Sequence, residues 1–198
     1  MCKVTFLRGL PGSGKSEWAE QIEKRNPNST VVLSFDELLH EYDPASYDAD
    51  YSMAFHKNYR EVTNLLHSRL FALVTLGGGE HIIVDNLNLD FEQVCQLAKA
   101  CDLAGAYELE LVNFFITVED SVRRQQRRKA HTVPEDRVRQ MDEALRKNYS
   151  CEFDGKVINL RFDTQEVIVA GNEYHQNDDK EYSVSAVASF NPSKSLLI

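Results

Sequence analysis

Long hydrophobic runs are missing from this sequence of 198 residues. No apolar stretch approaches the roughly 18 residues that mark a candidate membrane-spanning helix. At the amino end, Met1 to Val4 lead directly into an expected strand and leave no room for the apolar region of a signal peptide. We therefore expect an intracellular, cytoplasmic protein, with a nuclear location left open. Its length suits one domain with a sizeable core and perhaps an appendage.

Cysteine is scarce and scattered. The sequence has 4 cysteines, at Cys2, Cys95, Cys101 and Cys151, and they form no C-x-x-C pair. They fall in separate patterned segments, which favours reduced packing thiols over disulfides or a zinc site.

Positive charge is also scarce, except in one segment. Lys and Arg together number 22 against 31 Asp and Glu, which gives a formal net charge of −9. This balance argues against sequence-independent binding of nucleic acid over a broad surface. Residues 119–149 are different, because they carry nine Lys and Arg against six Asp and Glu, a local charge of +3.

One motif near the amino end stands out. The pattern G-x-x-x-x-G-K-[ST] is matched at every fixed position by Gly9, Leu10, Pro11, Gly12, Ser13, Gly14, Lys15 and Ser16. A strand-type segment precedes it and a helical pattern follows, which is the context that a phosphate-binding P-loop requires. The loop N–H groups and the helix start would hold phosphate, Lys15 would reach the β- and γ-phosphates, and the Ser16 hydroxyl would bind Mg²⁺. This context disfavours a Gly-rich turn without function.

The rest of the chain alternates between strand and helix patterns. Strands are expected at 30–35, 81–84, 107–116 and 156–162, with a possible short one at 166–169, and helices at 37–40, 51–76, 90–98 and after Pro134. Residues 41–50 read as a polar loop, and the face of helix 51–76 that carries Phe55 and Tyr59 reads as core. This alternation predicts an α/β fold with a parallel sheet covered by helices on both faces. We expect a P-loop domain at 1–165 and a flexible C-terminal extension at 166–198.

Two expected strands run into an acid. Asp36 follows the strand at 30–35, and Asp85 follows the strand at 81–84. The carboxyl ends of parallel strands face the ligand crevice, so both carboxylates should lie near the bound phosphates. Asp85 fits the carboxylate that P-loop enzymes place beside Mg²⁺. Asp36 could instead be the N-cap of the short helix that follows.

The basic segment contains the run Arg123-Arg124-Gln125-Gln126-Arg127-Arg128-Lys129. If this run is helical, Arg124 and Arg128 are four residues apart and share one face. Like charges in this arrangement repel one another, and a polyphosphate would relieve the repulsion. The pattern predicts an arginine-rich lid over the phosphates, with a solvated helix face as the alternative.

These motifs, in this order, resemble the polynucleotide 5′-hydroxyl kinase family of P-loop phosphotransferases over residues 3 to about 149. The resemblance implies ATP or another NTP as donor, Mg²⁺ at Ser16 and Asp85, and a nucleic-acid 5′ end as partner. It also implies that Asp36 is the general base for the attacking hydroxyl. Lys15, Arg124 and Arg128 would balance charge on the transferred group.

The chain departs from the family pattern in two places. The family commonly has an arginine a few residues after the base, where this chain has Leu38, Leu39 and His40. The family's Asp-Thr-Asn-Leu can be aligned with its acid at Asp85 or at Asn86, and Asp85 is preferred because it ends the strand. A small-molecule kinase of metabolite or antibiotic type therefore stays an alternative, as does a non-catalytic nucleotide-binding module. The sequence indicates no oligomeric state.

Overall fold

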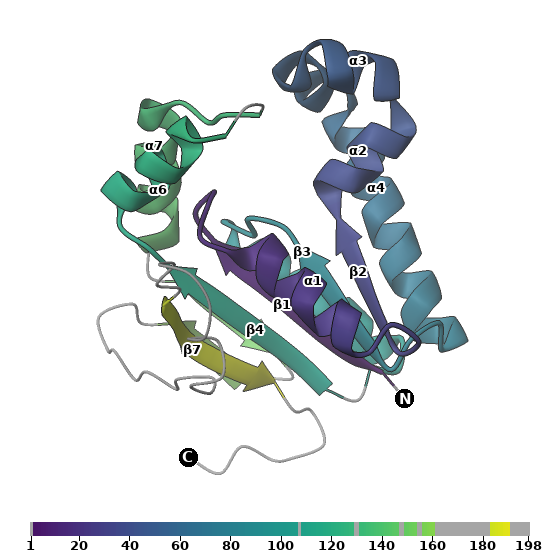
Figure 1. Cartoon of the computed structure of the whole chain (residues 1–198). Helices are drawn as coiled ribbons and strands as arrows, with labels where there is room; N and C mark the ends of the chain where they lie inside the picture. The colour runs from purple at the N-terminus through teal and green to yellow at the C-terminus, as the bar shows by residue number, and fades with distance from the viewer. Residues whose placement is uncertain are drawn as a thin grey trace.

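A five-stranded sheet forms the centre of the molecule in a computed structural model (Figure 1). The structure describes residues 2–106, 108–128 and 131–146, together with the backbone of strands at 149–153, 156–160 and 183–190. The strand order is β2-β3-β1-β4-β7. Neighbouring strands in the first part of this order run parallel: β1 (Lys3–Gly9), β2 (Thr30–Ser34), β3 (His81–Asp85) and β4 (Glu108–Phe115).

Helices cover both faces of this sheet, which confirms the expected fold class. They are α1 (Lys15–Arg25), α2 (Phe35–Tyr42), α3 (Pro44–Ala49), α4 (Tyr51–Leu76), α5 (Phe91–Leu103), α6 (Val118–Gln126) and α7 (Glu135–Arg146). Successive strand residues point to opposite faces. Leu7 accordingly packs with α1, whereas Phe6 packs in the larger core that α4 and α5 share. No helix in the described part of the chain is long and apolar enough to cross a membrane.

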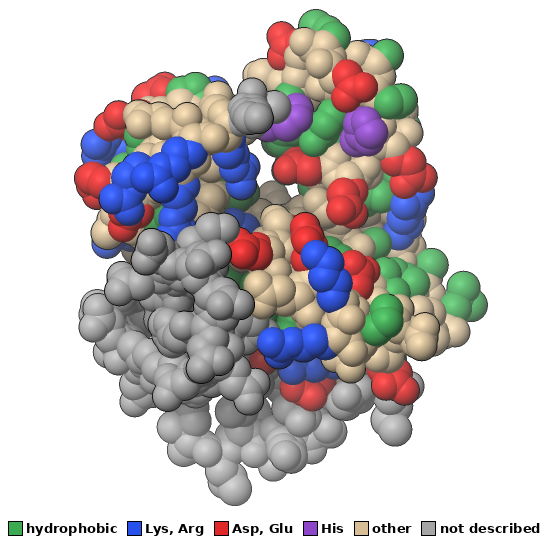
Figure 2. All heavy atoms as spheres, in the orientation of Figure 1, with side chains coloured by type: hydrophobic (Ala, Val, Ile, Leu, Met, Phe, Trp, Pro, Cys, Tyr) green, Lys and Arg blue, Asp and Glu red, His purple; other side chains and the backbone are tan. Residues whose placement is uncertain are grey.

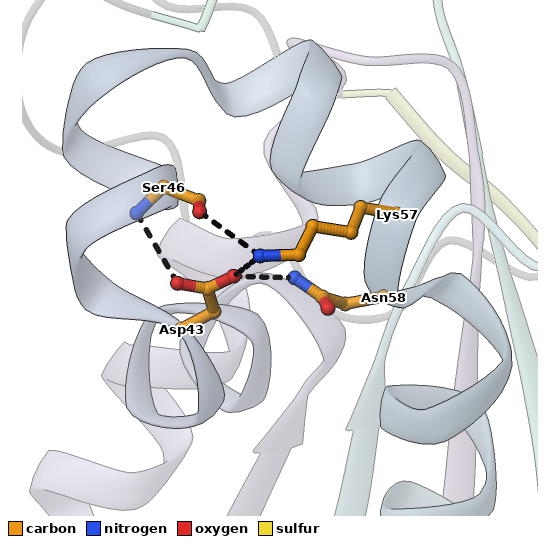
Figure 3. A network of polar contacts seen from close by, with 4 residues as sticks. All are labelled: Asp43, Ser46, Lys57 and Asn58. Carbon is orange, nitrogen blue, oxygen red and sulfur yellow. Dashed lines mark hydrogen bonds and ion pairs between the residues drawn. The ribbon is translucent and has the colours of Figure 1, made fainter.

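The expected polar loop at 41–50 contains a helix, α3. Asp43 is its N-cap, because Oδ1 accepts a hydrogen bond of 3.3 Å from the Ser46 N–H, and Pro44 starts the first turn. The other carboxylate oxygen accepts from Lys57 Nζ at 2.8 Å and from Asn58 Nδ2 at 2.9 Å (Figure 3). These bonds tie α3 to α4. Six residues are too few for helical periodicity to show in the sequence.

The expectation of reduced cysteines is wrong for Cys95, which is disulfide-bonded. It is confirmed for Cys2 and Cys101, which are free and buried. Burial raises the pKa of the Cys101 thiol to about 12, so this thiol stays protonated. A disulfide depends on which helices and strands meet in space, and sequence spacing alone does not give that information.

The C-terminal strands depart from the parallel pattern. β5 (Tyr149–Phe153) and β6 (Lys156–Leu160) form a separate antiparallel pair, so Tyr149 begins a strand instead of continuing the helix that ends at Arg146. β7 (Ser183–Phe190) pairs antiparallel with β4 and lies inside the predicted flexible extension. The domain boundary at residue 165 stays a prediction. The possible strand at 166–169 lies outside the described residues.

Candidate functional site

The P-loop connects β1 to α1, and its backbone shape depends on glycine. Gly9 has φ +153°, and a Cβ there would lie 2.4 Å from the carbonyl oxygen of Phe114. Gly14 has φ 98° and is the N-cap of α1. Residues with a side chain rarely adopt such φ values, so glycine is needed at these positions for the loop to wrap. In this conformation the first N–H groups of α1 are available to bind an anion.

Lys15 lies folded against this loop. Its side chain is 6% exposed, and Nζ donates hydrogen bonds to the carbonyl oxygens of Gly9 (3.1 Å) and Leu10 (2.8 Å) and to Ser13 Oγ (3.2 Å). Burial lowers the pKa of Lys15 to about 8, whereas the carboxylates of Asp85 and Asp36 oppose this shift. The ammonium group therefore lies within electrostatic reach of both predicted acids.

Asp85 ends β3 at the level of Ser34 on β2 and Leu7 on β1. It is 9% exposed, and burial raises the pKa of its carboxyl group, against the opposing effects of a hydrogen bond with Ser16 and the charge of Lys15. Asn86 has another task, because its Oδ1 accepts a hydrogen bond of 3.0 Å from the N–H of Phe35 at the start of α2. This arrangement favours Asp85 over Asn86 for the family's acidic position.

The donor set at Ser16 and Asp85 suits Mg²⁺. Mg²⁺ is usually held by one or two carboxylates together with substrate phosphates and water. A hydroxyl oxygen and a carboxylate oxygen lie next to each other here, beside the P-loop. Among the described residues, no group of three or more His, Cys, Asp or Glu could hold a metal ion alone. Ser16 and Asp85 would therefore bind Mg²⁺ jointly with a nucleotide.

Asp36 lies in the first turn of α2. β2 ends at Ser34, and Ser34 is also the N-cap of α2, so Asp36 neither ends the strand nor caps the helix. Its Oδ1 accepts a hydrogen bond of 2.7 Å from the hydroxyl of Tyr51, the first residue of α4. Asp36 and Lys15 line the same cavity, and the charge of Asp36 opposes the lowering of the Lys15 pKa.

A single cavity of about 790 Å³ brings most of the predicted site residues together. Those that line it are Pro11, Gly12, Gly14, Lys15, Ser16, Asp36, Asp85, Arg124 and Arg128. Gly9, Leu10 and Ser13 are buried, and Leu10 packs with Val118 and Val138 from α6 and α7. In Figure 2 the cavity corresponds to the hollow between the α6–α7 block, where Lys and Arg gather, and the α2–α4 block, where Asp, Glu and His gather.

The arginine segment rests directly on the P-loop. Ser121 Oγ donates a hydrogen bond of 2.7 Å to the carbonyl oxygen of Pro11, and Arg124 Nη1 donates one of 2.9 Å to that of Gly12. α6 ends at Gln126, so Arg128 follows the helix and does not share a helix face with Arg124. The charge of Arg128 contributes to lowering the pKa of Lys15, which places Arg128 near the P-loop lysine.

The cavity wall opposite the arginines is aromatic. It includes Phe35, Phe55 and Tyr59, whose ring centroids lie 5.3 to 5.6 Å apart. Tyr59 is 47% exposed, so its expected place in the core is wrong. In the described part of the chain, all Lys and Arg residues that line the cavity come from the P-loop or from residues 123–128. We call the part of the lining that comes from α2, α4 and residues 86–97 the acceptor half.

Three residues near the cavity are not predicted from the sequence: Tyr51, His131 and Arg8. Arg8 is 1% exposed, and it donates hydrogen bonds of 3.0 Å to the carbonyl oxygen of Asn88 and 3.1 Å to that of Leu89. It thereby anchors the connection from β3 to α5, which lines the cavity. An arginine inside an apolar strand was the available signal, because a buried charge needs partners. Tyr51 and His131 carried no comparable signal.

The chain is similar to one known family and to several solved structures. A family model described as AAA domain matches residues 4–147. A chain of the Pnkp1/Rnl/Hen1 RNA repair complex is 20% identical, with a TM-score of 0.57 over 80% of this chain and 48% of that chain. A gluconokinase from Sinorhizobium meliloti 1021 is 17% identical, with a TM-score of 0.48 over 73% of this chain and 75% of that one. The chain thus spans about half the length of the RNA-repair chain that it matches. The two chains share a fold.

Proposed function

The chain belongs to the AAA domain family, and on this premise we propose that it is a kinase that transfers the γ-phosphoryl group of ATP or another NTP to a hydroxyl group. The observation that carries the proposal is the pair of carboxylates around Lys15. Asp85 lies beside Ser16, whereas Asp36 belongs to the acceptor half of the cavity. Nucleotide binding alone needs no second carboxylate at that position.

Each residue has a physical role in the proposed transfer. The acceptor oxygen bonds to the γ-phosphorus while the bond from that phosphorus to the β,γ-bridging oxygen breaks, and the NDP leaves. Asp36 takes the acceptor proton as general base. Lys15 and Arg128 balance charge on the transferred group, and the P-loop N–H groups hold the phosphates in line. Mg²⁺, when bound at Ser16 and Asp85, would neutralise charge on the β- and γ-phosphates.

For the acceptor we propose the 5′-hydroxyl of RNA or DNA. The motif order supports this acceptor, as does the fold shared with a chain of an RNA repair complex. The aromatic wall adds support, because nucleobases stack on aromatic side chains. The cytoplasmic location stays a prediction from the sequence.

A neutral small-molecule hydroxyl is a second candidate acceptor. The observation that favours it is the absence of Lys and Arg from the acceptor half, as far as the structure describes its lining. Phosphate contacts from Lys and Arg supply much of the affinity for nucleic acids, and the described lining of the acceptor half offers neither residue.

The test uses ATP labelled at the γ-phosphate with two probes: a DNA oligonucleotide with a 5′-hydroxyl, and a nucleoside. Label at the oligonucleotide 5′ end, at a rate that falls steeply with salt, would support the first acceptor. Label only on a small molecule, with weak salt dependence, would support the second. ATP binding without transfer or hydrolysis would mean a non-catalytic nucleotide-binding module and would overturn the proposal.

A further inference from the structure

A chain of side-chain contacts crosses the cavity and ends on Asp36. The ring of His131 lies 4.8 Å from the ring of Tyr47 and 4.8 Å from that of Tyr51, between centroids. Tyr51 then donates its hydroxyl hydrogen to Asp36 Oδ1 at 2.7 Å. Tyr47 lies on α3 and Tyr51 on α4, whereas His131 lies between α6 and α7. The contact thus joins the arginine side of the cavity to the wall that holds the proposed base.

The backbone of His131 has an uncommon conformation. His131 has φ 57°, in the left-handed region that residues other than glycine seldom adopt. Such a conformation persists where surrounding contacts hold it, and it is frequent at functional sites. The ring contacts with Tyr47 and Tyr51 are interactions of this kind.

Tyr51 is suited to orient a carboxylate. Burial raises the pKa of its hydroxyl, with a further contribution from the charge of Asp36, so the group stays protonated and remains a donor. An ionised carboxylate accepts through both oxygens. With Oδ1 bound to Tyr51, Oδ2 is left to accept the proton of an acceptor hydroxyl.

We propose that Tyr51 is a positioning residue that orients Asp36 for proton abstraction, and that His131 holds the Tyr51 ring in place from across the cavity. The inference rests on the proposed kinase function. Two residues outside the P-loop motif would thereby affect transfer to the acceptor through Asp36. Hydrolysis of ATP by water, which needs no oriented acceptor hydroxyl, should be affected little.

The first test separates transfer from hydrolysis, with the 5′-hydroxyl oligonucleotide and the nucleoside as probes. Tyr51→Phe keeps the ring and removes the donor, so kcat for transfer should fall about tenfold, as expected for loss of a hydrogen bond to a charged group. Nucleotide KM and acceptor-free hydrolysis should stay within about twofold. His131→Ala should lower transfer in the same way, and His131→Phe, which restores a ring, should recover it.

Two matched controls belong to this test. Tyr42→Phe alters an exposed tyrosine of α2, and His40→Ala removes another imidazole that packs on Tyr47, at 4.9 Å, from the same side of the cavity. Neither should change transfer. Equal effects of Tyr51→Phe and Tyr42→Phe, or an equal fall in hydrolysis and transfer in Tyr51→Phe, would overturn the inference.

A second test does not depend on turnover, so it applies even if neither probe is phosphorylated and the proposed function fails. Hydrogen exchange in the nucleotide-free protein would be measured over residues 131–138. Tyr51→Leu removes the partner ring and should speed exchange there several-fold. Tyr59→Leu, which removes a ring of the wall that contacts Phe35 and Phe55, should not. Equal exchange in the two variants would overturn the inference.

Discussion

Arg124 donates a hydrogen bond of 2.9 Å from Nη1 to the carbonyl oxygen of Gly12, inside the P-loop itself. Arg128, four residues later, lies beyond the end of α6, and its charge reaches Lys15 instead. The sequence pattern treats these two arginines as an equivalent pair. The structure gives them different surroundings, because the helix ends between them.

We expect Arg124→Ala and Arg128→Ala to differ in their kinetic effects. Loss of Arg128 should lower kcat for transfer and for hydrolysis together, by about 10² to 10³, because its charge acts mainly on the transition state. Loss of Arg124 should instead loosen α6 on the P-loop and raise nucleotide KM several-fold. Steady-state kinetics would check both, with Arg137→Ala on the exposed face of α7 as the control. Interchanged effects would contradict the assignment.

Lys15→Met should abolish transfer while the protein stays folded. Methionine fills much of the space but removes the ammonium group, so kcat should fall far more than tenfold. The carbonyl oxygens of Gly9 and Leu10 lose a donor, at a cost of about 1 to 3 kcal/mol in unfolding free energy. Kinetics and chemical denaturation would measure the two effects. Lys24→Met, on an exposed lysine paired with Glu20, is the matched control. Retention of more than about a tenth of kcat, a loss below about 1.4 kcal/mol, would count against the kinase proposal.

Asp43 should make the attachment of α3 sensitive to acid. The hydrogen bonds from Lys57, then Asn58 and Ser46, hold the pKa of its carboxyl group well below the ordinary value. A carboxyl whose pKa is depressed in the folded state stabilises the fold above its unfolded pKa, near 4, and loses this contribution as pH falls further. At pH 7, Asp43→Asn should therefore melt below the wild type. As pH falls below about 4, the gap between the two melting temperatures should narrow progressively.

The control for this prediction is Asp48→Asn, which alters an exposed aspartate of α3 that pairs with His40. Its melting temperature should stay close to that of the wild type at pH 7. A constant gap between wild type and Asp43→Asn from pH 7 to pH 3 would contradict the prediction.

Truncation after residue 165 removes β7. The sequence predicts that residues 166–198 are a flexible extension, whereas the structure pairs β7 with β4. Removal of β7 would leave the backbone groups of β4 without their neighbour at the sheet edge. We expect unfolding free energy to fall by at least about 2 kcal/mol, a large share of the stability of a typical domain. Denaturant unfolding of both chains would measure it. Equal stability would support the sequence-based boundary and contradict a stabilising β7.

Local features of the site could be predicted from the sequence, whereas features that depend on distant contacts could not. The P-loop and the place of Asp85 at the end of β3 follow from neighbouring residues. The Tyr51–Asp36 bond joins the starts of two helices that are separated by α3, a helix that the sequence pattern did not predict. The end of α6, and with it the place of Arg128, depends on how the following chain turns back, where the Val133 N–H donates to Gln125 Oε1.

The most direct test of the account is transfer and acceptor-free hydrolysis measured side by side for Asp36→Asn. Asparagine keeps the shape but cannot take the hydroxyl proton, so transfer should fall by about 10² to 10⁴ while hydrolysis and nucleotide affinity stay near wild type. Glu37→Gln, which neutralises the next residue of α2 outside the cavity lining, should leave both reactions unchanged. Equal damage to transfer and hydrolysis in Asp36→Asn would place this carboxylate on the metal and contradict its role as the base.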